Sequence, residues 1–133
     1  MAIPEIIGSI RSTYTRTVCM VCEEKGIEYV LTEKPLHAPE IFEVIDAVMP
    51  AVREQIGVLD KAVTRTGYLV DEQFTFADIN LLPILHIVRQ LPEGAEAVAA
   101  APHLARYYDR HAARPSFRST IPPPGPPARA KAR

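Results

Sequence analysis

Four hydroxyl-bearing residues stand together near the N-terminus, where a helix is expected to begin. Ser12, Thr13, Tyr14 and Thr15 precede Arg16. A hydroxyl at a helix N-terminus can accept a backbone N–H and cap the helix, which is the commonest role of a serine there. It can also donate a hydrogen bond to an anion that the partial positive charge of the helix end attracts. Both roles stay open for Ser12.

A C-x-x-C pair, Cys19 and Cys22, follows within the same expected helix. This spacing near a strand–helix–strand unit is typical of thiol redox proteins, in which the first thiol lies at the helix N-terminus and has a lowered pKa. Cys19 instead lies about two turns inside the helix, directly after Val18. We therefore expect a buried, unreactive thiol, and a redox protein using Cys19 and Cys22 is the weaker alternative.

Thr75 and Asp78 have the spacing of a helix capping box, and Phe74 and Ile79 stand at the positions of a hydrophobic staple. This pattern assigns Asp78 to structure rather than to catalysis. His86 lies farther along the same apolar helix. A lone histidine in such a place is more often a hydrogen-bonded core residue than a base or a ligand.

The other histidines and the arginines form no recognisable site. His37, His103 and His111 have no metal-ligand spacing with one another or with the cysteines, so no metal is expected. Arginines recur every four residues near the C-terminus and predict a solvated stripe: Arg106, Arg110, Arg114 and Arg118. A net charge of −1 over 133 residues and the lack of a long apolar run predict no nucleic-acid or membrane partner.

A strand–helix–strand unit is expected to position the hydroxyls. Residues 4–10 predict a short strand, and residues 27–32, rich in aromatic and β-branched side chains, predict a second. Between them a helix is expected from Thr13 to Lys25, stopped by Gly26. Its apolar residues predict one buried stripe: Val18, Val21 and Cys22.

The rest of the chain has a helical pattern. Apolar residues at spacings of three and four predict a long helix from 39 to about 66, with a kink or break at Pro50. A nearly all-apolar helix over 76–91, kinked at Pro83, is expected at the centre of the core. Shorter elements complete the pattern: helices over 93–101 and 102–113, and a disordered proline-rich tail over 121–133. The expected fold class is α+β, mostly α.

Three segments, in this order along the chain, resemble the glutathione S-transferase family. Residues 11–18 and 23–29 look like the family's first strand turn, first helix and second strand. The run Tyr-Leu-x-Asp-x-x-Phe-Thr-x-Ala-Asp-Ile at 68–79 is similar to the folding motif of its helical domain, and residues 113–118 resemble its closing segment. The resemblance implies a partial thioredoxin-like β-α-β unit packed on a glutathione-transferase-type C-terminal helical bundle.

The same resemblance implies a function. Glutathione would be the cosubstrate, conjugated to small apolar electrophiles. Ser12 would be catalytic, with Tyr14 as the alternative, and Ser12, Thr13 and Arg16 would bind substrate. The resemblance also implies a homodimer. We expect a cytoplasmic protein, because the N-terminus lacks a secretory signal pattern, and two cysteines that remain thiols.

The segment between the first and second matches is short for the family. The family's glutathione-binding domain has a second half, with a strand after a cis-proline and a Glu-Ser or Gln-Ser turn that holds the γ-glutamyl carboxylate. Neither is found in this sequence. We interpret 1–36 as a truncated remnant of that domain, 37–120 as the helical domain and 121–133 as the tail.

Two consequences follow from the missing half. The first strand is expected to have an open edge, which favours pairing with another chain. Loss of a charged anchor for glutathione is expected to weaken its binding by about ten- to hundredfold. The chain is therefore expected to be a weak or inactive transferase, or else a non-catalytic helical module that self-associates.

Overall fold

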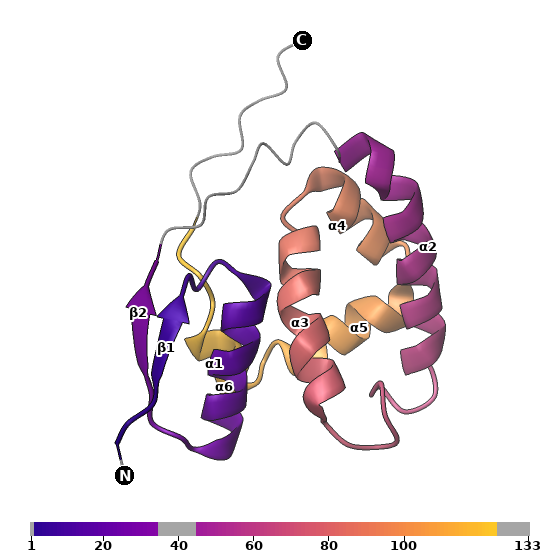
Figure 1. The fold of residues 1–133 in the computed structure, drawn as a ribbon. Helices are drawn as coiled ribbons and strands as arrows, with labels where there is room; N and C mark the ends of the chain where they lie inside the picture. Colours follow the sequence, from indigo (N-terminus) through magenta and orange to yellow (C-terminus); the bar gives the residue numbers. More distant parts are fainter. Residues whose placement is uncertain (1, 35–44, 125–133) are drawn as a thin grey trace.

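The computed structural model describes residues 2–34 and 45–124, which form a small parallel sheet beside a bundle of helices (Figure 1). The sheet unit contains β1 (Glu5–Gly8), α1 (Thr13–Lys25) and β2 (Val30–Glu33). The remaining elements are α2 (Ile45–Val63), α3 (Phe76–Val88), α4 (Pro92–Ala99), α5 (Pro102–His111) and α6 (Pro115–Ser119). This is the mostly helical α+β fold that the sequence predicts. The expected boundary at 36/37 lies outside the described residues.

The sheet consists of two parallel strands, with Glu5 opposite Val30 and Gly8 opposite Glu33. The second strand begins later than predicted, because Ile27 still belongs to the end of α1: its N–H donates to Cys22 O at 2.9 Å. Within the described part of the chain, β2 is the only strand that pairs with β1. No strand of these described residues pairs with the other edge of β1.

α1 has the predicted bounds, but its predicted buried stripe is wrong. Val18 is 48% exposed, and Val21 and Cys22 are only half-buried. The buried residues of the helix are Arg16, Thr17, Cys19 and Met20. The neighbours of α1 are the reason: the helix lies against β1, α3 and α6 (Figure 1). Arg16 bonds to the carbonyl of Phe117 on α6, and Met20 belongs to the core that α1 shares with the bundle.

α3 lies at the centre of the molecule, between α1 and the helices α2, α4 and α5 (Figure 1). Its residues Leu82 and Leu85 are buried, and they share one core with Met20 of α1 and with Leu104 and Tyr107 of α5. The nearly all-apolar composition of α3 follows from this position, because neighbours cover most of its circumference.

Neither internal proline interrupts its helix. Pro50 lies within α2 and Pro83 within α3, and both helices run continuously through them. A proline removes one N–H and displaces one carbonyl, a local loss that the burial of flanking residues such as Met49 and Ile56 can offset. Of the kink or break expected at Pro50, the break does not occur. The first part of that expected helix, before residue 45, lies outside the described residues.

A side chain of α2 caps the start of α5. Ala101, at the N-cap of α5, offers no side-chain acceptor, and Asp60 Oδ1 instead accepts the N–H groups of His103 and Leu104, each at 2.8 Å. The contact ties α2 to α5. None of the helices within the described residues combines the length and apolarity needed to cross a membrane.

The short helix α6, not expected from the sequence, joins the bundle to the sheet unit. Arg114 Nε and Nη2 donate to the two carboxylate oxygens of Glu24 on α1, each at 2.8 Å, and Ser116 Oγ donates to the same carboxylate at 2.6 Å. The Arg114 guanidinium also lies 3.7 Å from the ring centroid of Phe74. The predicted solvated stripe is therefore wrong at Arg114.

Candidate active site at the N-terminus of the first helix

The turn between β1 and α1 holds Ser12 at the N-cap position of α1. Ser12 N–H donates to Ser9 O at 2.9 Å, and Ser12 O accepts the N–H of Arg16 at 2.9 Å. Gly8 is needed at the end of β1, because a Cβ there would collide with the side chain of Thr15. This close approach of strand and helix makes the turn tight and fixes the backbone of Ser12.

The hydroxyl of Ser12 does not cap the helix. No side-chain cap bond forms at this position, and Ser12 Oγ has no hydrogen-bond partner among the residues that the structure describes. Ser12 is half-buried, and the first turn of α1 contains no acidic residue. A free hydroxyl beside the first N–H groups of a helix can donate to an anion.

The neighbouring hydroxyls differ in their surroundings. Tyr14 is 81% exposed, so most of its side chain is in contact with solvent. Thr13 and Thr15 are half-buried, and Thr15 lies against the backbone of Gly8. Ser12 at the N-cap and Thr13 at the first position of α1 are thus partly sheltered hydroxyls.

Arg16 is directed into the protein, where it contacts α6. It is 2% exposed, its Nη2 donates to Phe117 O at 2.9 Å and its Nε donates to Thr120 Oγ1 at 3.3 Å. The guanidinium lies 4.1 Å from the centroid of the Phe117 ring. Burial lowers the pKa of Arg16 to about 10, so the group stays charged at neutral pH. Its Nη1 has no hydrogen-bond partner within the described residues.

The two cysteines are free thiols in unequal surroundings. Cys19 is completely buried in the middle of α1, and burial raises the pKa of its thiol. Cys22 is half-buried one turn farther along. A raised pKa disfavours the thiolate on which disulfide exchange depends.

Asp78 is buried in the capping box at the start of α3. Its Oδ2 accepts the N–H of Thr75 at 2.8 Å, and its Oδ1 accepts the hydroxyl of Tyr107 at 2.7 Å and the N–H of Leu69 at 3.3 Å. These bonds use both carboxylate oxygens inside the core. Asp78 therefore stabilises the fold and has no free oxygen for chemistry.

The histidines are also engaged in structural contacts. His86 Nδ1 lies 3.0 Å from Tyr108 Oη, and His111 Nε2 lies 2.7 Å from Gly67 O. Burial is the main cause of the lowered pKa of both imidazoles. Within residues 2–34 and 45–124, no three His, Cys, Asp or Glu side chains are placed to hold a metal ion.

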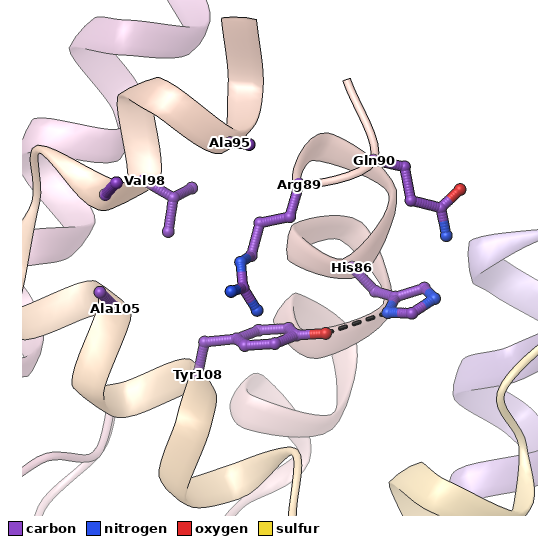
Figure 2. A pocket seen from close by; sticks show the side chains of 8 residues that line it. His86, Arg89, Gln90, Ala95, Val98, Ala105 and Tyr108 are labelled. Carbon is purple, nitrogen blue, oxygen red and sulfur yellow. Dashed lines mark hydrogen bonds between the residues drawn. The ribbon is translucent and has the colours of Figure 1, made fainter. Parts of the chain in front are cut away.

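A cavity between α3, α4 and α5 was not anticipated from the sequence. Its polar wall contains His86, Arg89, Gln90 and Tyr108 (Figure 2). The spacing of the first three residues, at i, i+3 and i+4 on an otherwise apolar helix, is the signal that could have indicated a polar face there.

Comparison with known proteins identifies the family. The family model for the glutathione S-transferase C-terminal domain matches residues 21–115. Glutathione S-transferase 3 of Zea mays is 36% identical over 97 residues, which cover 69% of this chain and 38% of that protein. The chain thus spans 38% of the length of this curated relative.

Solved structures share the fold at low identity. A glutathione S-transferase III in apo form has a TM-score of 0.76 at 18% identity, covering 93% of this chain and 100% of its own. Glutathione transferase F7 of Populus trichocarpa has a TM-score of 0.74 at 13% identity, with coverages of 87% and 96%. A glutathione S-transferase of Methylobacterium radiotolerans, solved with glutathione sulfonate, has a TM-score of 0.62 at 15% identity, with coverages of 96% and 99%. The fold is thus that of glutathione S-transferases. Because the family model matches most of the sequence, the chain belongs to the glutathione S-transferase family.

Proposed function

We propose that the protein stabilises the thiolate of glutathione at the N-terminus of α1, with the Ser12 hydroxyl as the hydrogen-bond donor. The observation that carries this proposal is the unpartnered Oγ of Ser12 at the N-cap of a helix with no acidic residue in its first turn. Thr13 at the first helical position contributes its N–H and its half-buried side chain. Arg16 supports the turn from behind through its contacts with α6.

The proposed reaction is conjugation to a small apolar electrophile. The thiol gives its proton to solvent, and the Ser12 O–H and the helix dipole stabilise the resulting thiolate. The sulfur then forms a bond to the electrophilic carbon, and the leaving group departs with the electron pair of the broken bond. A cytoplasmic setting supplies reduced glutathione and fits two cysteines that are both free thiols.

We propose further that binding is weak because the glutathione site is truncated. The sheet of the described residues has two strands and contains no cis peptide bond, so these residues lack the strand after a cis-proline that the family uses. Loss of one charged anchor corresponds to about ten- to hundredfold in affinity. Activity is accordingly expected to be low rather than absent.

The test is conjugation of glutathione to a chromogenic aryl chloride, measured as kcat/KM above the uncatalysed rate. Ser12→Ala is expected to lower kcat/KM by about ten- to hundredfold, the value of one charge-assisted hydrogen bond. Ser119→Ala is the matched control, because this serine is exposed on α6. Tyr14→Phe tests the rival hydroxyl. Equal activity of Ser12→Ala and wild type, or loss only in Tyr14→Phe, contradicts the assignment.

A second candidate function, self-association into a homodimer, is favoured by the open edge of β1. Pro4 O accepts the N–H of Val30, and Gly8 O accepts that of Lys34, just after β2. Because alternate residues of a strand bond to the same neighbour, the backbone groups of Glu5 and Ile7 face the open edge. Ile7 is 64% exposed there. Ile7→Lys is expected to shift a dimer toward monomer in light scattering after size exclusion, whereas Val58→Lys on α2 is not. A monomeric wild type excludes this function.

A further inference from the structure

The cavity between α3, α4 and α5 has an apolar wall and a polar wall (Figure 2). Its volume is about 370 Å³, within the range of small-molecule sites. Ala95 and Val98 of α4 and Ala105 of α5 form the apolar wall. Small side chains leave this side open to a flat hydrocarbon body. The cavity lies in the helical bundle, and Ser12 is not among its lining residues.

The polar wall is held in place before any ligand arrives. The Arg89 guanidinium lies 4.1 Å from the centroid of the Tyr108 ring, and Tyr108 Oη in turn lies 3.0 Å from His86 Nδ1 (Figure 2). Stacking on an aromatic face leaves the N–H edges of a guanidinium available. Arg89 forms no ion pair with any residue that the structure describes. Arg89 is exposed, and its charge has no counterion among residues 2–34 and 45–124.

A second positive charge lies behind this wall. The Phe117 ring has its centroid 5.7 Å from that of Tyr108 and 5.6 Å from that of His86, and Arg16 stacks on the same ring. The partners of Arg16 are neutral oxygens of Phe117 and Thr120. Burial is the main cause of the lowered pKa of His86, and the charges of Arg16 and Arg89 add to it. Among the described residues, no acidic side chain lines the cavity, so the net charge of these lining residues is positive.

We propose that this cavity binds a small aromatic or branched carboxylic acid. The carboxylate pairs with the N–H edge of Arg89, because a guanidinium binds a carboxylate through two parallel hydrogen bonds. The hydrocarbon body lies against Ala95, Val98 and Ala105, and Gln90 at the rim offers a further amide donor. The site is independent of thiol chemistry at Ser12.

The test is a titration of the full-length protein with benzoate, followed by NMR of the methyl groups and the arginine Nε–H groups. Benzoate is expected to shift the methyls of Val98 and Ala105 and the Arg89 Nε–H, with a Kd on the order of 1 mM for so small a ligand. Arg89→Met, which keeps the stem of the side chain, is expected to weaken binding at least about tenfold. Arg106→Met is the matched control, because Arg106 is exposed on α5 and does not line the cavity.

Two further probes test the charged contact and the apolar contact of the ligand separately. Benzamide, with the same ring and no charge, is expected to bind at least about tenfold more weakly than benzoate. Inorganic phosphate, with charge and no apolar body, is expected to leave the Val98 methyls unshifted. Equal binding of benzoate by wild type and Arg89→Met overturns the proposal, as do equal binding of benzamide and benzoate or the absence of shifts at Val98 and Ala105. Glutathione conjugation by Arg89→Met is expected to stay unchanged, which separates this site from Ser12.

Discussion

The helical bundle and the sheet unit differ in how completely their apolar side chains are buried. In the bundle, Leu82 is completely buried, and Leu104 and Tyr107 are buried beside it. In the sheet unit, Ile7 and Val30, which lie on the same face, are both exposed. A two-stranded sheet is marginal on its own. The core lies mainly in the bundle and reaches α1 only at Met20 and Val21, so the sheet unit depends on the docking of α1 against α3 and α6.

The region with the weaker packing is the one that carries the candidate chemistry. Ser12 lies in the turn that joins β1 to α1, and α1 is held from behind by Arg16 and by the contact of Glu24 with Arg114. The family's folding motif, by contrast, lies in the bundle. The difference indicates that stability and activity can be changed separately, which the following substitutions test.

The largest effect is expected from Asp78→Ala. It leaves the N–H groups of Thr75 and Leu69 and the hydroxyl of Tyr107 without their acceptor inside the core. Because each buried unsatisfied donor costs about 1–3 kcal/mol, we expect the free energy of unfolding to fall by about 3–5 kcal/mol. Urea denaturation followed by circular dichroism measures it. Asp109→Ala, at an exposed position of α5, is the control, and a loss below about 1 kcal/mol would contradict the structural role.

Leu82→Ala against Ile7→Ala compares the two regions directly. Leu82 is completely buried, and its truncation leaves a cavity in the bundle, which is expected to cost about 2–5 kcal/mol. Ile7 is 64% exposed, and its truncation is expected to change stability by less than about 0.5 kcal/mol. The same denaturation experiment measures both. A large loss in Ile7→Ala would mean that something covers this face of the sheet in solution.

A smaller effect than that of Leu82→Ala is expected at the ion pair of Glu24 with Arg114, which links the two regions. Hydrogen bonding to Arg114 holds the pKa of Glu24 below its ordinary value of 4.5. A carboxyl with a lowered folded-state pKa stabilises the protein above its unfolded pKa, and this stabilisation is lost as the pH falls through the folded pKa. Glu24→Gln is expected to lose about 1 kcal/mol at pH 7 and to approach the stability of wild type as the pH falls through the folded-state pKa of Glu24. Glu28→Gln, exposed after α1, serves as control. If the difference in the free energy of unfolding between wild type and Glu24→Gln grew as the pH fell, the proposed role of this ion pair would be contradicted.

The sequence predicted helix boundaries well, but it predicted poorly which residues of a helix are buried by contacts with other elements. The bounds of α1 and the start of α3 were predicted because their signals, Gly26 and the pair Thr75 and Asp78, act within one turn of chain. The burial of Arg16 was missed, since it depends on contacts with Phe117 and Thr120, about a hundred residues away in sequence. Tertiary contacts, not helical periodicity, select the buried face.

The candidate site shows the same division. The neighbouring residues predicted that Ser12 stands at the start of a helix. Only the structure shows that its hydroxyl forms no capping hydrogen bond with the helix. The cavity at Arg89 could not be predicted, because α4 and α5 supply its apolar wall and the sequence does not reveal their packing.

The most direct test of the central claim is the pKa of the thiol of bound glutathione, followed by the ultraviolet absorbance of its thiolate in wild type and in Ser12→Ala. A free thiol of this kind titrates near pH 8.5. Because one pKa unit corresponds to about 1.4 kcal/mol, a charge-assisted bond from Ser12 is expected to lower this value by about one unit or more in wild type. In Ser12→Ala the value is expected to return toward 8.5. The same pKa in both proteins would contradict the assignment of Ser12.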